Sequence, residues 1–270
     1  MARIEELWRY DGRRAVVTGC ASGIGAQVAR QLRELGAHVT GLDRSPAPGV
    51  NDFHEVDLSD PASIDQAVAG IAGPVDALFN VAGVSSGIGD PLLVVTINFL
   101  GLRHLTEALI PSMPDGSSIV SVSSLAAAAY REHGQQVAPL LRTATMPEGV
   151  SWCESHPETL GKGYELSKEA IILYTMGSAV ELGKRGIRIN CTGPGVTETP
   201  ILEQLRAAYG PALLDDIAKP LGRVSDPAEQ AAVLLFLNSR AASYISGQVV
   251  WVDGGNVGAT IAAELQEGQA

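Results

Sequence analysis

The stretch RAVVTGCASGIG, residues 14–25, decides the fold that we expect. Residues 14–19 form a short apolar run with β-branched side chains, and this run ends at a glycine. Residues 24–36 then place apolar side chains at helical intervals and stop at another glycine. A strand, a glycine-rich turn and a helix in this order predict the first βα unit of an α/β protein.

The same alternation continues along the chain. We expect further strands at residues 37–43, 53–60, 75–83, 117–124, 186–195 and 247–255, and further helices at residues 61–72, 92–110 and 164–184. Because apolar strands alternate with helices, the sequence predicts a doubly wound parallel sheet with helices on both faces. No linker divides the chain, so we expect one domain over residues 1–258 and a weakly ordered tail over residues 259–270.

Composition and charge argue against several classes of protein. The chain has 270 residues, of which 46% are hydrophobic, so it can bury a sizeable core. Its formal net charge is −11 and it has no basic run, which argues against nucleic acid and membrane surfaces as partners. The N-terminal residues MARIEELWRY are charged, and no run approaches the ~18 apolar residues of a membrane helix. We therefore expect a soluble, cytoplasmic protein.

The cysteines and histidines do not predict a metal site. Cys20, Cys153 and Cys191 are scattered and form no CxxC pair, and the five histidines show no HExxH spacing. We therefore expect neither a disulfide framework nor a bound metal ion. Cys153 has no basic neighbour in the sequence, so we interpret it as an inert thiol.

The turn after the first strand is a candidate nucleotide site. Its glycines allow the backbone to approach a pyrophosphate, and the helix that follows offers free N–H groups to the anion. A turn of this kind is also common in α/β proteins that bind no nucleotide. Asp43 ends the second strand, where a carboxylate can accept hydrogen bonds from ribose hydroxyls and repel a 2′-phosphate. Arg44 could attract that phosphate, but the position of Asp43 favours NAD over NADP.

A second candidate site lies in the segment GYELSKEA, residues 163–170. Tyr164 and Lys168 are four residues apart, so a helix would place them on one face, one turn from each other. The two could form an ordinary surface pair. They could also form an acid–base device, because a neighbouring ammonium favours the phenolate of a tyrosine whose ordinary pKa of ~10 makes it a poor base.

In combination, these motifs resemble the classical short-chain dehydrogenase/reductase family. The resemblance extends from about residue 12 to about residue 257, and it rests on TGxxxGIG at 18–25, Asp57-Leu58, Asn80-Val81-Ala82-Gly83, Asn98, Ser124, Tyr164-xxx-Lys168, Asn190 and Pro194-Gly195. Val81 replaces the second asparagine of the family motif NNAG, which is a small departure. The resemblance implies a single Rossmann-type domain with its active site at the carboxyl edge of the sheet, and it implies a nicotinamide-dependent oxidoreductase.

The resemblance also implies roles for individual residues. Tyr164 would carry the proton, Lys168 would favour its phenolate and hold the nicotinamide ribose, Ser124 would bind the substrate oxygen, and Asn98 would hold a water. Ser123 competes with Ser124, because neighbouring residues of a strand point to opposite faces. The residues expected at the cofactor are Gly19, Ser22, Gly23, Ile24, Gly25, Asp43, Arg44, Asp57, Leu58, Asn80, Ala82, Gly83, Tyr164, Lys168, Pro194, Gly195, Val196 and Thr197.

An unusually long segment separates Ser124 from Tyr164. Residues 125–163 have mixed polarity and several prolines, so we expect short helices and loops near the substrate mouth. Within the family, this insert resembles that of 3α-hydroxysteroid dehydrogenase/carbonyl reductases and coniferyl-alcohol dehydrogenases, which implies a bulky apolar or aromatic alcohol or carbonyl substrate. The alternative is that the insert serves packing or assembly, with His133 and His156 as surface residues.

Two segments near the C-terminus complete the expected enzyme. By resemblance to the family, residues 197–223 would close over cofactor and substrate, with Thr197 at the nicotinamide carboxamide and the helix as a lid. The segment YISGQVVWVDGG, residues 244–255, resembles the last strand of the family, which often packs between subunits. We therefore expect a homodimer or homotetramer.

One motif suggests a different class of protein. Gly83-Val84-Ser85-Ser86-Gly87 matches GxSxG, the nucleophile motif of serine hydrolases. That motif requires a helix directly after the serine, whereas Gly87, Gly89, Asp90 and Pro91 follow here. A serine hydrolase is therefore the lesser alternative, and a cofactor-binding regulator is a third, against which the intact Tyr164 and Lys168 argue.

Overall fold

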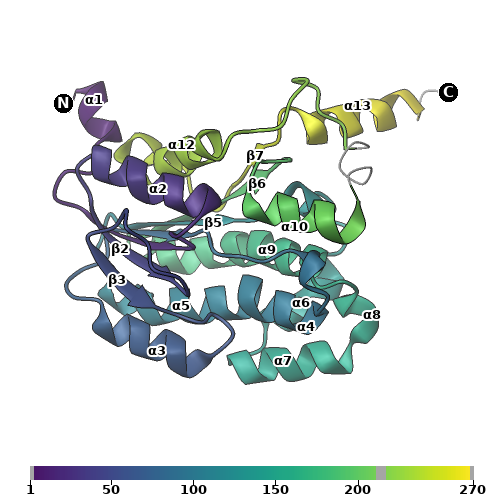
Figure 1. The fold of residues 1–270 in the computed structure, drawn as a ribbon, viewed down its shortest axis with the longest axis horizontal. Helices are drawn as coiled ribbons and strands as arrows, with labels where there is room; N and C mark the ends of the chain where they lie inside the picture. Colours follow the sequence, from purple (N-terminus) through teal and green to yellow (C-terminus); the bar gives the residue numbers. More distant parts are fainter. Residues whose placement is uncertain (1–2, 211–216, 268–270) are drawn as a thin grey trace.

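The computed structural model describes residues 3–210 and 217–267 (Figure 1). The strands are β1 (Arg14–Thr18), β2 (His38–Asp43), β3 (Asp52–Glu55), β4 (Ala77–Asn80), β5 (Ser118–Val122), β6 (Arg188–Pro194) and β7 (Val249–Val252). The α-helices are α1 (Ile4–Trp8), α2 (Gly23–Glu34), α3 (Pro61–Gly70), α4 (Pro91–Val95), α5 (Leu102–Leu109), α6 (Gly134–Leu141), α7 (Met146–Ser155), α8 (Pro157–Leu160), α9 (Tyr164–Gly183), α10 (Pro200–Tyr209), α12 (Pro227–Asn238) and α13 (Asn256–Glu267).

The described strands form one parallel sheet of seven in the order β3-β2-β1-β4-β5-β6-β7. The order reverses at β1, because β2 and β3 lie on one side of this strand and β4 to β7 lie on the other. Helices α2 and α12 cover one face of the sheet, while α3, α5 and α9 cover the other (Figure 1). The prediction of a doubly wound parallel sheet is therefore confirmed.

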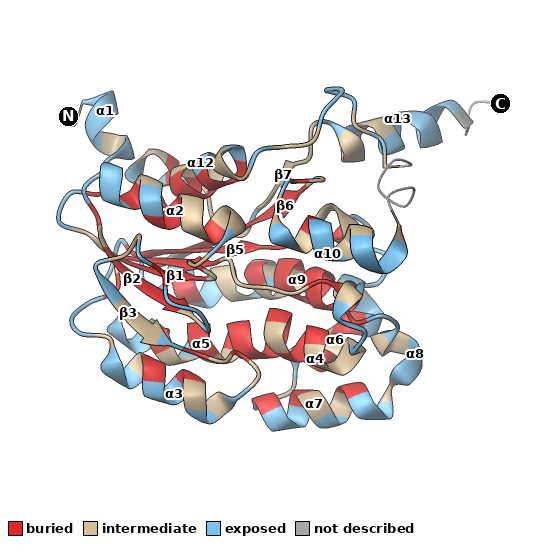
Figure 2. Ribbon diagram, viewed as in Figure 1, coloured by how far each residue is buried: buried red, intermediate tan, exposed pale blue. Residues whose placement is uncertain are grey.

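The sheet separates two apolar layers, and consecutive strand residues point into them alternately. In β5, Ile119 belongs to the layer with α3, α5 and α9, whereas Val120 belongs to the layer with α2 and α12. The strands at the centre of the sheet are buried almost throughout (Figure 2). This burial on both faces explains why the strands are continuous apolar runs in the sequence.

The C-terminal segment differs from the expected weakly ordered tail. Residues Asn256–Glu267 form helix α13, while residues 268–270 lie outside the described part of the chain. The Asp253 carboxylate accepts hydrogen bonds from the backbone N–H groups of Gly255 and Val257, at distances of 3.0 and 2.8 Å. A carboxylate at this place satisfies N–H groups at the start of a helix, which stabilises the helix there.

A helical stretch also proves more apolar than expected from the sequence. Residues Pro91–Ser112 join α4, a π-helical turn η2 (Thr96–Gly101), α5 and a 3₁₀ turn η3 (Ile110–Ser112) into a segment long and apolar enough, by length and composition, to cross a membrane. However, 72% of the most apolar 18-residue stretch of this segment is buried inside the protein. Phe99 and Leu105, for example, are completely buried. This is the pattern of a core helix.

The insert forms the expected short helices. Helices α6, α7 and α8 lie on the face of the sheet that α3, α5 and α9 cover, and α7 is the outermost of these elements (Figure 1). Val137, Leu140, Met146 and Cys153 are buried in the same apolar layer as α9. The apolar side chains of these helices therefore pack into the core, and the expected position of the insert near the substrate mouth stays a prediction.

Arg103 of α5 is buried and forms hydrogen bonds with the insert. Its guanidinium lies over the ring of Phe99 and donates hydrogen bonds to the carbonyl oxygens of Leu140 and Leu141 and to Oγ1 of Thr143. These acceptors follow or end α6, where carbonyl groups lack helical partners and attract a cation. The buried arginine therefore joins the insert to α5.

Candidate active site

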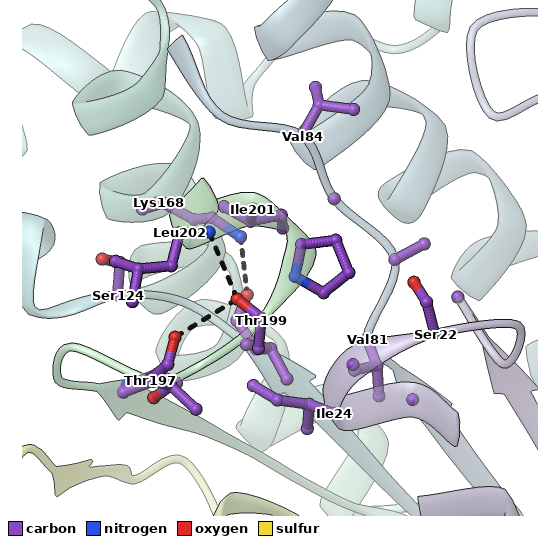
Figure 3. Close-up of a pocket in the computed structure, with 18 of the residues that line it drawn as sticks. Ser22, Ile24, Val81, Val84, Ser124, Lys168, Thr197, Thr199, Ile201 and Leu202 are labelled. Atoms are coloured by element: carbon purple, nitrogen blue, oxygen red, sulfur yellow. Dashed lines mark hydrogen bonds between the residues drawn. The ribbon is translucent and has the colours of Figure 1, made fainter. Parts of the chain in front are cut away.

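A cavity of about 570 Å³ opens at the carboxyl ends of the central strands. Its wall includes the turn after β1, the ends of β2, β5 and β6, the start of α9 and the first turns of α10. In Figure 3, Ser124 and Thr197 lie on one side of this cavity, and Ser22 lies on the other. The reversal of strand order at β1 opens a crevice at this edge of a doubly wound sheet, which is where such proteins bind ligands.

The glycine-rich turn is shaped for a close backbone approach. A Cβ atom on Gly25 would lie 2.1 Å from the carbonyl oxygen of Gly19, so only glycine allows α2 to pack on the strand. Gly19 has φ of +70°, which glycine adopts readily. Ser22 precedes α2 without capping it through its side chain, so the first N–H groups of α2 remain for an anion at the cavity wall. This cradle fits the pyrophosphate of a dinucleotide.

Two carboxylates line the cavity beside the glycine-rich turn. Asp43 accepts hydrogen bonds from the backbone N–H groups of Ala21 and Ser45, both at 3.0 Å, which ties β2 to the turn. Asp57 accepts from the backbone N–H and the hydroxyl of Ser59, and these hydrogen bonds lower the pKa of Asp57. Arg44 also lines the cavity, and its charge lowers the pKa of Asp57 further. The positive charge of Arg44 is thus partly offset by a neighbouring carboxylate.

Tyr164, Ser124 and Lys168 meet at the opposite end of the cavity. The side chain of Ser124 lies close enough to the Tyr164 phenol to influence its pKa, and the Lys168 ammonium lies 5.7 Å from the centre of the tyrosine ring. Lys168 donates to the carbonyl oxygen of Val122 at 3.0 Å, so its position is fixed between β5 and α9. Helix α9 begins at Tyr164, which explains how the four-residue spacing brings both side chains to one wall.

Burial decides the pKa values of this pair. It lowers the pKa of Lys168 from 10.5 to about 8, because a buried ammonium loses its hydration. It also raises the pKa of Tyr164, while the hydrogen bond with Ser124 opposes that rise. We expected the lysine to lower the pKa of Tyr164. In the protein, the effect of burial is larger, and the pKa of Tyr164 is raised.

The choice between Ser123 and Ser124 follows from their partners. Ser123 is buried and donates to the backbone carbonyl oxygen of Lys168 at 2.7 Å. Ser124 accepts a hydrogen bond from the backbone N–H of Ala126 at 3.2 Å and presents its hydroxyl to Tyr164. Ser123 therefore supports the backbone of α9, and Ser124 is available to a ligand.

Asn98 lies behind the cavity wall and does not line it. Its side-chain oxygen accepts from the backbone N–H of Val84 at 2.8 Å, and its Nδ2 donates to the carbonyl oxygen of Val84 and to Oγ of Ser167. The side chain thus fixes the loop after β4 to α9. Asn98 lies in the π-helical turn η2, and such turns often occur at functional sites.

The structure brings most of the predicted site residues to one cavity. Of the residues expected at the cofactor or in catalysis, Asn80 and Asn98 are the two that do not line it. Asn80 is buried, and its Nδ2 donates to the hydroxyls of Thr106 and Ser121, so it links β4 to α5 and β5. The side chain of Asn80 thus points into the protein, and a contact of Asn80 with the cofactor stays a prediction.

Helix α10 lies in the region that we expected to close over cofactor and substrate, and it supplies further walls of the cavity. The cavity is also lined by Thr199, Pro200, Ile201, Leu202, Gln204 and Leu205. Thr199 caps this helix, since its Oγ1 accepts from the backbone N–H of Leu202 and donates to the carbonyl oxygen of Thr197 (Figure 3). The sequence signal was Thr199-Pro200, a helix start. The expected lid region extends to residue 223, and its residues 211–216 lie outside the described part of the chain.

The GxSxG motif does not form a hydrolase site. Ser85 is completely buried, its Oγ accepts from the backbone N–H of Gly87, and Gln204 is its side-chain partner at 3.5 Å. Only a 3₁₀ turn, η1 (Ser86–Ile88), follows this serine. The motif instead packs against α10. A Cβ atom on Gly87 would lie 3.2 Å from the carbonyl oxygen of Gln204 and 3.4 Å from Cβ of Ala208, both on α10.

Comparisons with known proteins agree with this geometry. A sequence profile described as short chain dehydrogenase matches residues 13–136, and one described as enoyl-(acyl carrier protein) reductase matches residues 155–256. The chain belongs to the short-chain dehydrogenase/reductase family and is an oxidoreductase of alcohols and carbonyls that uses a nicotinamide cofactor.

The most informative relatives act on two kinds of substrate. The chain is 38% identical to a coniferyl-alcohol dehydrogenase of Pseudomonas sp. (strain HR199), over 90% of this chain and 96% of that protein. It is 31% identical to a 3-alpha-hydroxysteroid dehydrogenase/carbonyl reductase of Comamonas testosteroni, over 89% and 95%. The structure of a 3-alpha-hydroxysteroid dehydrogenase from Pseudomonas sp. B-0831, complexed with NADH, superimposes with a TM-score of 0.80 at 32% identity, over 93% and 99% of the two chains.

Proposed function

We propose that the protein is an NAD-dependent dehydrogenase that interconverts a bulky apolar secondary or aryl alcohol and its carbonyl compound. The observation that carries this proposal is the meeting of Tyr164, Ser124 and Lys168 at one end of a cavity whose other end is a glycine cradle. An alcohol seated there would lie between a proton carrier and the cofactor. Apolar side chains of Leu125, Ile201 and Leu205 line the same cavity, which suits an apolar substrate.

The chain's own residues hold and move the proton in this proposal. When bound, the nicotinamide accepts a hydride from the alcohol carbon or returns one to the carbonyl carbon. Tyr164 takes the proton of the alcohol hydroxyl during oxidation and donates it to the carbonyl oxygen during reduction. Ser124 donates a hydrogen bond to the same oxygen and keeps it beside the phenol. The Lys168 ammonium favours the phenolate form that oxidation requires.

Our preference for NAD over NADP rests on the two carboxylates beside the glycine-rich turn. Asp43 and Asp57 would face the adenosine ribose, where a 2′-phosphate adds negative charge. Arg44 is their neighbour, and the carboxylate of Asp57 already offsets part of its charge. The residues proposed to hold the remainder of the dinucleotide are Gly19, Ser22, Gly23, Ile24, Gly25, Leu58, Ala82, Gly83, Pro194, Gly195, Val196 and Thr197.

Two candidate substrates are compatible with this proposal. The superposition on a 3-alpha-hydroxysteroid dehydrogenase supports a 3α-hydroxysteroid, whereas the 38% identity to a coniferyl-alcohol dehydrogenase supports a coniferyl-type primary alcohol. We further propose a homodimer or homotetramer in the cytoplasm, where three free cysteines would stay reduced.

A direct comparison of substrates tests this proposal. The wild-type protein should reduce NAD with a 3α-hydroxysteroid or coniferyl alcohol, followed by NADH absorbance, and NADP should serve poorly. A protein that oxidises neither alcohol with either cofactor would contradict the proposed function. Labelling of the wild type by a serine-directed fluorophosphonate would support the hydrolase instead.

A further inference from the structure

A second cavity adjoins the first at its catalytic end. It measures about 440 Å³, and Leu125, Gly195, Val196 and Ile217 line both cavities. Leu125 directly follows Ser124, so the shared wall lies beside the hydroxyl group that faces Tyr164. A ligand whose oxygen sits at Ser124 can therefore extend past Leu125 into the second cavity.

In the proposed function the dinucleotide and the substrate share the first cavity. Many of its walls are residues of the glycine-rich turn and of the ends of β2 and β4, which we assign to the dinucleotide. The space left beside Ser124 is bounded by α10. The second cavity begins where this space ends, and so it is the continuation open to a long substrate.

An aromatic wall is built into the second cavity. Trp251 of β7 lines it, and the register of the sheet places this residue beside Gly193 of β6. A Cβ atom on Gly193 would lie 2.1 Å from the indole ring, so the ring occupies the place of a missing side chain. The contact with Gly193 fixes the indole ring, which therefore presents an ordered aromatic surface to a ligand.

The charged residues of the second cavity are held by partners within the protein. Arg223 forms a two-pronged ion pair with Glu229, at 2.6 and 2.8 Å. Asp253 accepts from the start of α13, and Lys219 donates to the carbonyl oxygen of Ile217. The remaining lining includes Pro220 and Leu221, and the side chain of Leu221 is 70% exposed. The cavity therefore suits an apolar group.

We propose that the second cavity is a distal subsite for the fused rings of a polycyclic alcohol, at the end remote from the reacting carbon. Trp251 and Leu221 contact those rings, while Tyr164 and Ser124 engage the hydroxyl group. This inference rests on the proposed function and narrows it. A one-ring aryl alcohol ends before Leu125 and does not reach the subsite.

Variants of the distal wall test the subsite. Trp251→Ala should raise the KM for a 3α-hydroxysteroid about ten-fold, and Leu221→Ser should raise it about three-fold, because each removes apolar contact area. The KM for a one-ring aryl alcohol and the KM for NAD should stay within about two-fold of wild type in both variants. Leu221 is mostly exposed, so its replacement should not disturb folding. The matched control is Tyr244→Ala, an exposed aromatic side chain outside both cavities.

Binding measured without turnover separates this inference from the proposed function. Calorimetric titration of the steroid should give a dissociation constant about three-fold weaker for Leu221→Ser than for wild type. If no alcohol is oxidised but this difference is found, the proposed function fails and the subsite stands. Equal changes for one-ring and polycyclic substrates would overturn the subsite. Unchanged constants with a change of sedimenting mass would also overturn it, because Trp251 would then belong to a subunit interface.

Discussion

At the scale of single residues, Lys168 is a buried lysine, with only 4% of its surface exposed to solvent. Burial lowers its pKa from 10.5 to about 8, so the unfolded chain binds this proton more tightly than the folded one. The free energy of unfolding should therefore rise with pH between about pH 8 and pH 10 as this penalty disappears. The burial of Lys168 therefore costs stability at a residue that we propose to act in catalysis.

Replacement of Lys168 by an apolar residue of similar length should separate stability from activity. Lys168→Met should gain up to about 3 kcal/mol in free energy of unfolding at pH 7, because a pKa lowered to about 8 carries a penalty of that order. The gain should shrink by pH 10, and turnover should be lost at both pH values. Urea unfolding at pH 7 and pH 10 measures this. Lys162→Met, at an exposed lysine, is the control, and a Lys168→Met protein less stable at both pH values would refute the argument.

Asp43 should decide which cofactor is used. Asp43→Ser removes a negative charge from the part of the cavity wall where we propose that the adenosine ribose binds. The ratio of kcat/KM for NADP to that for NAD should therefore rise about ten-fold or more. Steady-state kinetics with both cofactors measures this ratio. Asp65→Ser on α3, at a carboxylate paired with His104 on the surface, should leave the ratio unchanged. If wild-type protein already prefers NADP, Arg44 and not Asp43 controls the choice.

The sequence predicted the positions of those site residues that lie close together in the chain. Tyr164 and Lys168 share a helix, and the glycines share one turn, so local periodicity alone places them. The sequence did not indicate that the side chain of Asn80 lies outside the cavity wall, because its orientation depends on contacts far along the chain. Nothing local to Asn80 indicates that Thr106 and Ser121 occupy its side-chain N–H groups.

At the scale of elements, helices α6, α7 and α8 of the insert pack into the core, whereas Leu125 and Ala126 at the start of the insert line the first cavity. Trp152 packs on the apolar core and stacks on His156, at 4.4 Å between ring centres, and it lines neither cavity. His133 is half-exposed and bonded to Glu169 of α9 at 2.7 Å. Cys153 is buried, and burial raises the pKa of its thiol to about 11, which agrees with an inert thiol.

Truncation within the insert should therefore change stability and leave substrate binding alone. Leu140→Ala should lower the free energy of unfolding by about 2–5 kcal/mol, because Leu140 is completely buried. The KM for a bulky alcohol should remain at the wild-type value in the folded fraction. Leu205→Ala on α10 is the matched control, since Leu205 lines the cavity and its loss should raise that KM. A raised KM in Leu140→Ala would show that the insert shapes the substrate site.

At the scale of the whole molecule, α13 carries apolar side chains that face outward. Ile261 and Leu265 are 51% and 64% exposed and lie four residues apart, on one face of this helix. Strand β7, which precedes this helix in the chain, is an edge strand of the sheet and is only partly buried. Exposed apolar residues and a sheet edge are both suited to contact between subunits.

Sedimentation should show a particle of two or four chains, each of 28.1 kDa. The double variant Ile261→Glu and Leu265→Glu should sediment as a monomer, because charge at an apolar contact opposes association. Val180→Glu on α9 is the control, since Val180 is exposed to a similar extent on another face. If the control dissociates the particle and the double variant does not, α13 is not the interface.

The order of the strands and of helices α2, α3, α5 and α9 could be predicted, because buried strands read as short apolar runs and these helices as longer segments with helical periodicity. Helices α1, α12 and α13 were not predicted. Two features of larger scale could not be predicted either. The position of α7 depends on which face of the sheet offers apolar space, and the length of Pro91–Ser112 depends on a π-helical turn that joins two helices. Both are decided by packing between distant segments.

The most direct test of the account is the loss of the proton carrier alone. Tyr164→Phe keeps the ring and removes the hydroxyl, so oxidation of a 3α-hydroxysteroid or coniferyl alcohol should fall at least about a hundred-fold. NAD should bind this variant as it binds the wild type, because its proposed cradle lies over the glycine-rich turn and Asp43. Initial rates of NADH formation and calorimetric titration with NAD measure the two quantities. Turnover at the wild-type rate in Tyr164→Phe would contradict the central claim.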